Sequence, residues 1–269
     1  MSGLKEALRR GMALLGYEVH RTSNAKVSLV NFENLAQAYE RRLNEADGLI
    51  AENSLRVKLL ARLLGTPPSE AYFIVQALSR TRDVVGDVCE FGVAQGETSA
   101  LIANEIRSSG VTFHLFDSFQ GLPTPTEKDE LRDDIFGLGS MASYKGAMSC
   151  PEDLVLSRLK AISFPDDRFV IHRGFVEDVL RTDRTLPERV RFAYLDFDLY
   201  QPTKVVLEFL HERGSVGSIV IVDDYDFFST GVKSAVDEFI AEKNRDLPQY
   251  ECSVPERLYG CFAVLVRSR

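Results

Sequence analysis

The sequence predicts an α/β protein with a mostly parallel, Rossmann-like sheet, an antiparallel C-terminal hairpin and an N-terminal helical extension. From residue 86 onward, short β-branched and apolar runs alternate with segments of helical spacing. This order is typical of a parallel sheet covered by helices on both faces. The last two apolar runs are separated only by RLY, too few residues for the crossover that joins parallel strands. Residues 1–80 instead repeat apolar positions at intervals of three and four, as helices do.

The expected elements follow in order along the chain. The clearest helical patterns before the sheet cover residues 3–17, 31–53 and 54–65. Parallel strands are expected within residues 86–93, 111–117, 167–173, 190–198 and 218–224, and the hairpin strands within 249–256 and 260–268. We therefore expect a helical extension over residues 1–80 and a sheet domain over residues 81–269.

One stretch of the expected sheet domain has no clear period. Residues 120–148, QGLPTPTEKDELRDDIFGLGSMASYKGAM, combine prolines, glycines and charged residues. Stretches of this length without regular structure are usually lids, binding loops or disordered segments. We expect a lid beside the active site, and the alternative is a solvated surface loop.

Composition and charge weigh against several classes of protein. Hydrophobic residues make up 45% of the chain, charged residues 27%, and the formal net charge is −8, which weighs against a nucleic-acid binder because such proteins usually carry a basic surface. The four cysteines lie far apart without a CxxC pair, as expected of free thiols in a reducing compartment. No signal peptide and no apolar run of membrane-spanning length is evident. We expect a soluble, cytoplasmic protein.

The stretch EFGVAQGETS, residues 90–99, joins the first expected strand to a helix through Gly92 and Gly96. Glycines let a ligand approach the backbone, and the helix N-terminus offers free N–H groups. The spacing is GxxxG, so the pyrophosphate fingerprint GxGxxG is absent. Asp117 ends the next strand, where an acidic residue commonly accepts hydrogen bonds from ribose. Glu90 lies in an apolar strand where a carboxylate needs a partner, and the alternatives are the ligand ammonium group or nearby backbone N–H groups.

Together these features favour S-adenosylmethionine, an adenosine with a compact amino-acid tail. The alternative is a glycine turn that only packs helix on strand. The candidate cofactor-binding residues are Glu90, Phe91, Gly92, Ala94, Gly96, Thr98, Ser99, Asp117 and Ser118.

Four carboxylates follow two expected strands. Asp196 and Asp198 end one strand, and Asp223 and Asp224 end the next. If the strands are neighbours, the carboxylates repel one another unless a cation is bound, and an all-oxygen set suits Mg²⁺ or Ca²⁺. The alternative is that some of them cap helices or pair with basic side chains. Our hypothesis assigns Asp196, Asp223 and Asp224 as metal ligands and Asp198 as catalytic base, a division that spacing leaves open.

Four segments, EFGVAQGETS, LFDSFQGLPTPTEKDE, LDFDLYQPTKVVLEFL and IVIVDDYDFFSTGVKSAVDEF, resemble the macrocin O-methyltransferase family. The resemblance runs from about Gly86 to the C-terminus. Members of that family include metal-dependent enzymes that methylate deoxysugar hydroxyls of antibiotics. The resemblance implies a class I methyltransferase sheet, S-adenosylmethionine and Mg²⁺ as cofactors, and for the four aspartates the roles given above. Catechol methyltransferases instead carry a lysine where this sequence has Leu199.

We therefore expect a Mg²⁺-dependent S-adenosylmethionine O-methyltransferase that acts on a sugar hydroxyl of a natural-product glycoside or a surface glycan. Residues 1–80 are then expected to cover the acceptor or to make a homodimer contact. An NAD(P)-dependent oxidoreductase on a similar sheet and a methyltransferase-like partner protein without catalysis are the competing interpretations.

Overall fold

The structure is a computed structural model of the chain and describes residues 53–269. The helices expected at residues 3–17 and 31–52 lie outside the described residues. The described helices are α3 (Ser54–Leu60), α4 (Pro68–Arg80), α5 (Glu97–Glu105), α6 (Glu152–Ala161), α7 (Val176–Thr182), α8 (Tyr200–Arg213) and α9 (Gly231–Lys243). Two short 3₁₀ helices span Met141–Tyr144 and Asp166–Arg168.

Seven strands form one sheet in the order β3-β2-β1-β4-β5-β7-β6. Their bounds are β1 (Asp87–Phe91), β2 (Phe113–Asp117), β3 (Phe169–Arg173), β4 (Val190–Leu195), β5 (Gly214–Val222), β6 (Tyr250–Ser253) and β7 (Ala263–Arg267). Strands β1 to β5 are parallel, whereas β7 pairs antiparallel with both β5 and β6. The predicted parallel sheet and its antiparallel C-terminal hairpin are both confirmed.

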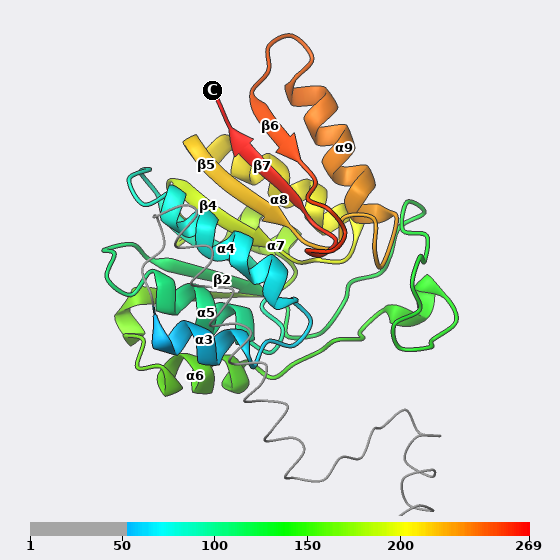
Figure 1. Cartoon of the computed structure of the whole chain (residues 1–269). Helices are drawn as coiled ribbons and strands as arrows, with labels where there is room; N and C mark the ends of the chain where they lie inside the picture. Colours follow the sequence, from blue (N-terminus) through cyan, green and yellow to red (C-terminus); the bar gives the residue numbers. More distant parts are fainter. Residues whose placement is uncertain (1–52) are drawn as a thin grey trace, which may run out of the picture.

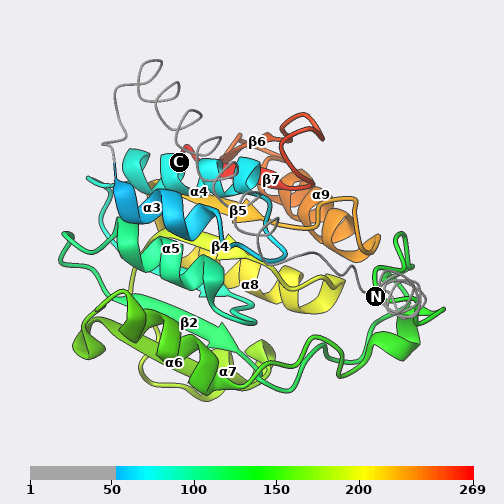
Figure 2. The same cartoon turned by 60° about the horizontal axis from the view of Figure 1, so that its bottom comes forward.

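Helices cover both faces of this sheet (Figures 1 and 2). On one face α4, α5 and α6 pack on apolar side chains such as Phe113 and Phe192. On the other face α7, α8 and α9 pack on side chains such as Ala193 and Val220. Because neighbouring residues of a strand point to opposite faces, a strand buried on both sides is apolar at nearly every position, as β4 is apart from Arg191.

Helix α4 belongs to the main core although it lies within the expected N-terminal extension. Two prolines, Pro67 and Pro68, start the helix, and proline suits a first turn because its missing N–H would have no helical partner there. Three of its apolar residues, Ile74, Ala77 and Leu78, then lie in the same cluster as the sheet residues. The described end of the extension is therefore packed on the sheet.

Residues 120–148 leave the end of β2 and run past the N-terminal ends of α8 and α9 (Figure 1). Leu122 and Tyr144 pack with Leu199 and Phe228 in a separate apolar cluster. An isolated antiparallel bridge also joins Leu131 to Ser229. The segment is thus anchored along one side of the sheet's carboxyl ends. Among residues 53–269, no helix has both the length and the apolar character needed to cross a membrane.

Candidate active site

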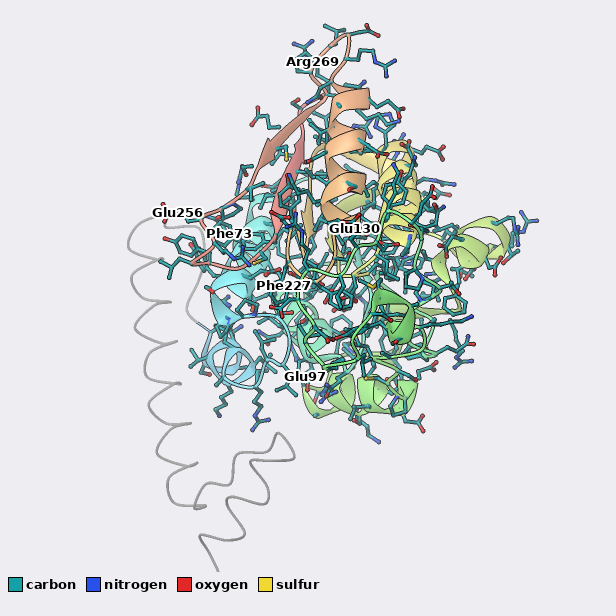
Figure 3. The ribbon with its side chains drawn as sticks, turned by 90° about the vertical axis from the view of Figure 1, so that its right-hand side faces the viewer. Phe73, Glu97, Glu130, Phe227, Glu256 and Arg269 are labelled. Carbon is teal, nitrogen blue, oxygen red and sulfur yellow. The ribbon has the colours of Figure 1, made fainter. Side chains whose placement is uncertain are left out.

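A cavity of about 640 Å³ lies at the carboxyl ends of β1, β2, β4 and β5, and a cavity of this size is typical of small-molecule sites. Its lining combines Gly92 and Asp117 with the carboxylates that follow β4 and β5. Phe227, another lining residue, lies near the start of α9 and the 120–148 segment in Figure 3. The two features that the sequence singled out therefore open into one cavity.

The glycine turn lies directly against the end of β4. Gly92 has a φ of +85°, and a Cβ added there would lie 1.8 Å from the carbonyl oxygen of Asp196, so no other residue fits. Gly96, with a φ of +81°, precedes the first residue of α5. Ala94 also has a left-handed backbone, with a φ of 45°. This turn brings its backbone close to Asp196.

Asp117 holds the glycine turn in place. One carboxylate oxygen, Oδ2, accepts hydrogen bonds from the backbone N–H groups of Val93 and Ala94 at 2.8 and 2.9 Å. The other, Oδ1, accepts from the N–H of Phe119 at 2.6 Å. The next residue, Ser118, donates from its hydroxyl to the carbonyl of Gly121. Asp117 and Ser118 both line the cavity, so each can reach a ligand there.

Glu90 and Ser99 lie behind the cavity wall. Both are fully buried, and neither carboxylate oxygen of Glu90 nor the hydroxyl of Ser99 has a hydrogen-bond partner. Burial raises the pKa of Glu90 to about 8, and the proximity of Ser99 opposes this shift only in part. Glu90 is therefore mostly protonated at neutral pH. Of the other expected cofactor residues, Phe91 is buried in the core and Thr98 lies in the first turn of α5.

Three carboxylates form a cluster that suits a cation. Oxygens of Asp196, Asp198 and Asp224 all lie within 4.8 Å of one another, a spacing that fits one hard cation with oxygen ligands. Burial, followed by the neighbouring Asp223 and Asp198 carboxylates, raises the pKa of Asp196 well above its usual range. Burial and the carboxylates of Asp198 and Asp223 do the same for the pKa of Asp224. A bound cation would remove this repulsion.

The backbone at two cluster members is strained. Asp198 and Asp224 have φ values of 61° and 57°, in the left-handed region that residues other than glycine seldom adopt. Such strain persists where the surroundings impose it, and it concentrates at functional sites. Both of these aspartates line the same cavity.

Asp223 lies beside that cluster but has hydrogen-bond partners of its own. Its Oδ2 accepts a hydrogen bond from the Tyr194 hydroxyl at 2.5 Å, and its Oδ1 accepts from the backbone N–H of Asp224. Asp223 and Asp224 both follow the end of β5 and line the cavity. The geometry thus groups Asp198 with Asp196 and Asp224, whereas the sequence-based hypothesis placed Asp223 there. The division of ligand and base roles stays a prediction.

The sequence analysis missed two side chains of this site. Glu70, in the first turn of α4, lines the cavity, and Tyr194 lies at its edge with a hydroxyl that donates to Asp223. The signal available for Glu70 was an acidic residue near a helix N-terminus, which is common for electrostatic reasons alone. Tyr194 had no signal, because an aromatic residue inside an apolar strand is ordinary.

A mostly parallel sheet with an antiparallel C-terminal hairpin is typical of a Rossmann-like methyltransferase. The glycine turn beside a carboxylate cluster agrees with this class. The model of the macrocin-O-methyltransferase (TylF) family matches residues 74–252. The chain belongs to this family.

Two curated relatives are each 31% identical to the chain. Demethyldecarbamoylnovobiocin O-methyltransferase of Streptomyces niveus matches over 165 residues, 60% of each protein. The 8-demethyl-8-(2,3-dimethoxy-alpha-L-rhamnosyl)-tetracenomycin-C 4'-O-methyltransferase of Streptomyces olivaceus matches over 145 residues, 53% of this chain and 54% of that protein. The chain therefore spans less than two thirds of the length of either relative.

Solved structures share the fold. The O-methyltransferase NovP superposes with a TM-score of 0.63 at 27% identity, covering 76% of this chain and 81% of NovP. The calicheamicin methyltransferase CalS11 gives 0.55 at 22% identity over 92% and 94% of the two chains. An O-methyltransferase from Bacillus cereus, solved with S-adenosylhomocysteine, gives 0.53 at 16% identity over 88% of this chain and all of that one. The last two likenesses concern the fold alone.

Proposed function

We propose that this protein is a Mg²⁺-dependent S-adenosylmethionine O-methyltransferase that acts on a sugar hydroxyl of a natural-product glycoside or a surface glycan. The observation that carries the proposal is the contact between Gly92 of the turn and the backbone of Asp196. Methyl transfer requires the donor and the acceptor oxygen to be in line and close together. A donor bound at the turn and a cation at the carboxylates would be neighbours in this one cavity.

The comparisons support the reaction class and the kind of acceptor. Both curated relatives are named O-methyltransferases, and the name of the second specifies a rhamnosyl group on tetracenomycin C. The acidic motifs that follow β4 and β5 both fall within the 74–252 segment that the family model matches. An NAD(P)-dependent oxidoreductase is less well supported because the turn lacks the third glycine of the pyrophosphate fingerprint.

The chain's own residues would divide the chemistry as follows. When bound, Mg²⁺ supplies Lewis acidity that lowers the pKa of an acceptor hydroxyl. Asp196, Asp223 and Asp224 hold the ion in our proposal, and Asp198 accepts the hydroxyl proton at a carboxylate oxygen. The alternative division places Asp198 among the metal ligands in place of Asp223, because an oxygen of Asp198 lies within 4.8 Å of oxygens of Asp196 and Asp224. Aspartate variants can distinguish the two divisions.

The mouth of the cavity would receive the acceptor. Ile135 and Phe136 of the 120–148 segment line the cavity although they are 40% and 58% exposed, and Phe227 faces the same space. Apolar side chains that stay exposed in a cavity often mark a binding surface. We propose that residues 120–148 act as a lid over the acceptor and that the N-terminal region covers the acceptor or makes a homodimer contact.

A methyl-transfer screen tests the function. The protein is incubated with S-adenosylmethionine and a panel of deoxysugar glycosides, with Mg²⁺ or with chelator, and products are analysed by mass spectrometry. We expect a mass gain of one methyl group on a glycoside, lost on chelation. Full activity in chelator would exclude the metal role. Calorimetric binding of NAD without binding of S-adenosylmethionine would overturn the proposal as a whole.

A further inference from the structure

Glu70 presents a buried carboxylate oxygen that has no partner. The residue is 0% exposed, its Oε1 lies 3.2 Å from the Tyr194 hydroxyl, whose single proton is directed to Asp223, and its Oε2 makes no hydrogen bond. Leaving such an oxygen buried and unpaired costs free energy. Glu70 nevertheless lines the cavity. A hydrogen-bond donor on a bound ligand would satisfy it.

A chain of hydrogen bonds places Glu70 between the glycine turn and the carboxylate cluster. The Thr98 hydroxyl, in the first turn of α5, lies 3.1 Å from that of Thr66. Thr66 lies 3.2 Å from the Tyr194 hydroxyl, which in turn contacts both Glu70 and Asp223. Glu70 therefore stands where the cofactor end of the cavity meets the proposed cation site.

The loop between β6 and β7 closes over the unpaired oxygen. Gly260 packs so near that a Cβ added there would lie 2.8 Å from Oε2 of Glu70. Gly260 and Cys261 line the same cavity. The carboxylate is thus enclosed on the loop side, while the residue itself is part of the cavity lining.

The cavity favours a cationic donor. Among the described residues its lining contains seven carboxylates and no Lys, Arg or His side chain; the carboxylates are Glu70, Asp117, Glu177, Asp196, Asp198, Asp223 and Asp224. The cation cluster Asp196, Asp198 and Asp224 does not include Glu70. Glu90 is similarly buried and unpaired, yet it does not line the cavity. Glu70 is therefore placed to meet a second cation.

We propose that Glu70 binds the ammonium group of the cofactor's amino-acid end. This inference rests on the proposed function. The methyl group to be transferred is bonded to the cofactor's sulfur, which must face the acceptor beside the carboxylate cluster. The ammonium group is only a few bonds from that sulfur, so it lies in the region between turn and cluster. Burial and the carboxylates of Asp223 and Asp196 raise the pKa of Glu70 well above its usual range. A bound ammonium group would favour the ionised carboxylate and make a charge-assisted hydrogen bond with it.

Calorimetry with two ligands tests the assignment. S-adenosylhomocysteine and its analogue without the amino group are titrated into the wild type, Glu70→Gln and Glu90→Gln. Wild type should bind S-adenosylhomocysteine at least tenfold tighter than the analogue. Glu70→Gln should weaken the binding of S-adenosylhomocysteine by about 10- to 100-fold, the range expected for losing a hydrogen bond to a charged group. Binding of the analogue should weaken by less than about threefold. Glu90→Gln tests the other buried, unpaired glutamate near the site, and we expect it to affect both ligands equally.

Each outcome bears on the inference. Equal binding of the two ligands by wild type would overturn it without any variant, and so would discrimination lost in Glu90→Gln rather than in Glu70→Gln. A Glu70→Gln protein with weaker Mg²⁺ binding and unchanged ligand discrimination would assign Glu70 to the metal. Glu70→Asp keeps the charge and should retain part of the discrimination. Failure of wild type to bind S-adenosylhomocysteine at all would instead refute the proposed function.

Discussion

Replacing Glu90 by Gln should make the stability of the protein less dependent on pH. Burial holds the pKa of Glu90 at about 8, against a reference value of 4.5. Between these two values the folded state keeps a proton that the unfolded state has lost. Stability therefore falls as pH rises, and the part due to Glu90 is fully present only below the unfolded pKa. Gln, which cannot ionise, removes this dependence while keeping the shape of the side chain.

The magnitude follows from linkage. One proton of difference changes the free energy of unfolding by ~1.4 kcal/mol per pH unit. From pH 5 to pH 8, wild type should lose ~4 kcal/mol more than Glu90→Gln. The two proteins should be similar near pH 5, where Glu90 is protonated in wild type, and the variant should be the more stable at pH 8.

Urea denaturation of metal-free and cofactor-free protein at several pH values measures this difference. The aspartate cluster is present in both proteins, so the comparison isolates Glu90 together with its effect on the pKa of Asp196. Glu188→Gln serves as a control because Glu188 is exposed and precedes β4, at the opposite end of the sheet from the cavity. Wild type and Glu90→Gln curves that run parallel from pH 5 to pH 8 would show that Glu90 does not carry a buried proton.

Three further predictions concern the cofactor, the aspartates and the N-terminal region. Asp117→Ala should weaken S-adenosylhomocysteine binding by ~1–3 kcal/mol in calorimetry, because it also releases the N–H groups of the turn; unchanged affinity would contradict this. Asp198→Asn should keep Mg²⁺ affinity and lose turnover by ~10²–10⁴-fold, a loss that shrinks as pH rises because hydroxide replaces the base. Loss of metal in Asp198→Asn but not in Asp196→Asn would exchange their roles. Deleting residues 1–52 should abolish acceptor turnover but leave cofactor binding measurable by calorimetry, and full activity would refute an acceptor-side role.

The sheet could be predicted because its signals are local. Strand residues such as those of β4 are mostly apolar, with Arg191 as the exception, and this pattern can be read directly from the sequence. The antiparallel hairpin followed from the length of a loop, since three residues cannot hold a crossover helix. The order of the strands in space then placed β1, β4 and β5 side by side, which is why the expected turn and carboxylates share one cavity.

The division of labour among the carboxylates depends on three-dimensional contacts that the sequence does not contain. The sequence placed Asp223 and Asp224 together because they are adjacent in it. In the fold they separate, since a tyrosine on the neighbouring strand binds Asp223 and a left-handed backbone turns Asp224 toward Asp198. Asp117 was expected to meet ribose, and its position allows this, yet its first partners are backbone N–H groups of the glycine turn.

Glu70 and Glu90 show why composition and spacing could not assign every site residue. Both are glutamates, both are fully buried, and both have an unpaired carboxylate oxygen. The sequence singles out Glu90 because it interrupts an apolar strand, whereas Glu70 lies in a helical pattern where a charged residue is ordinary. Only Glu70 reaches the cavity, because α4 packs across the strand ends and the loop at Gly260 closes over it. Burial raises the pKa of both glutamates, but only Glu70 lines the cavity, where a cationic ligand would favour its ionised form. The two glutamates should therefore respond differently to the same change to Gln.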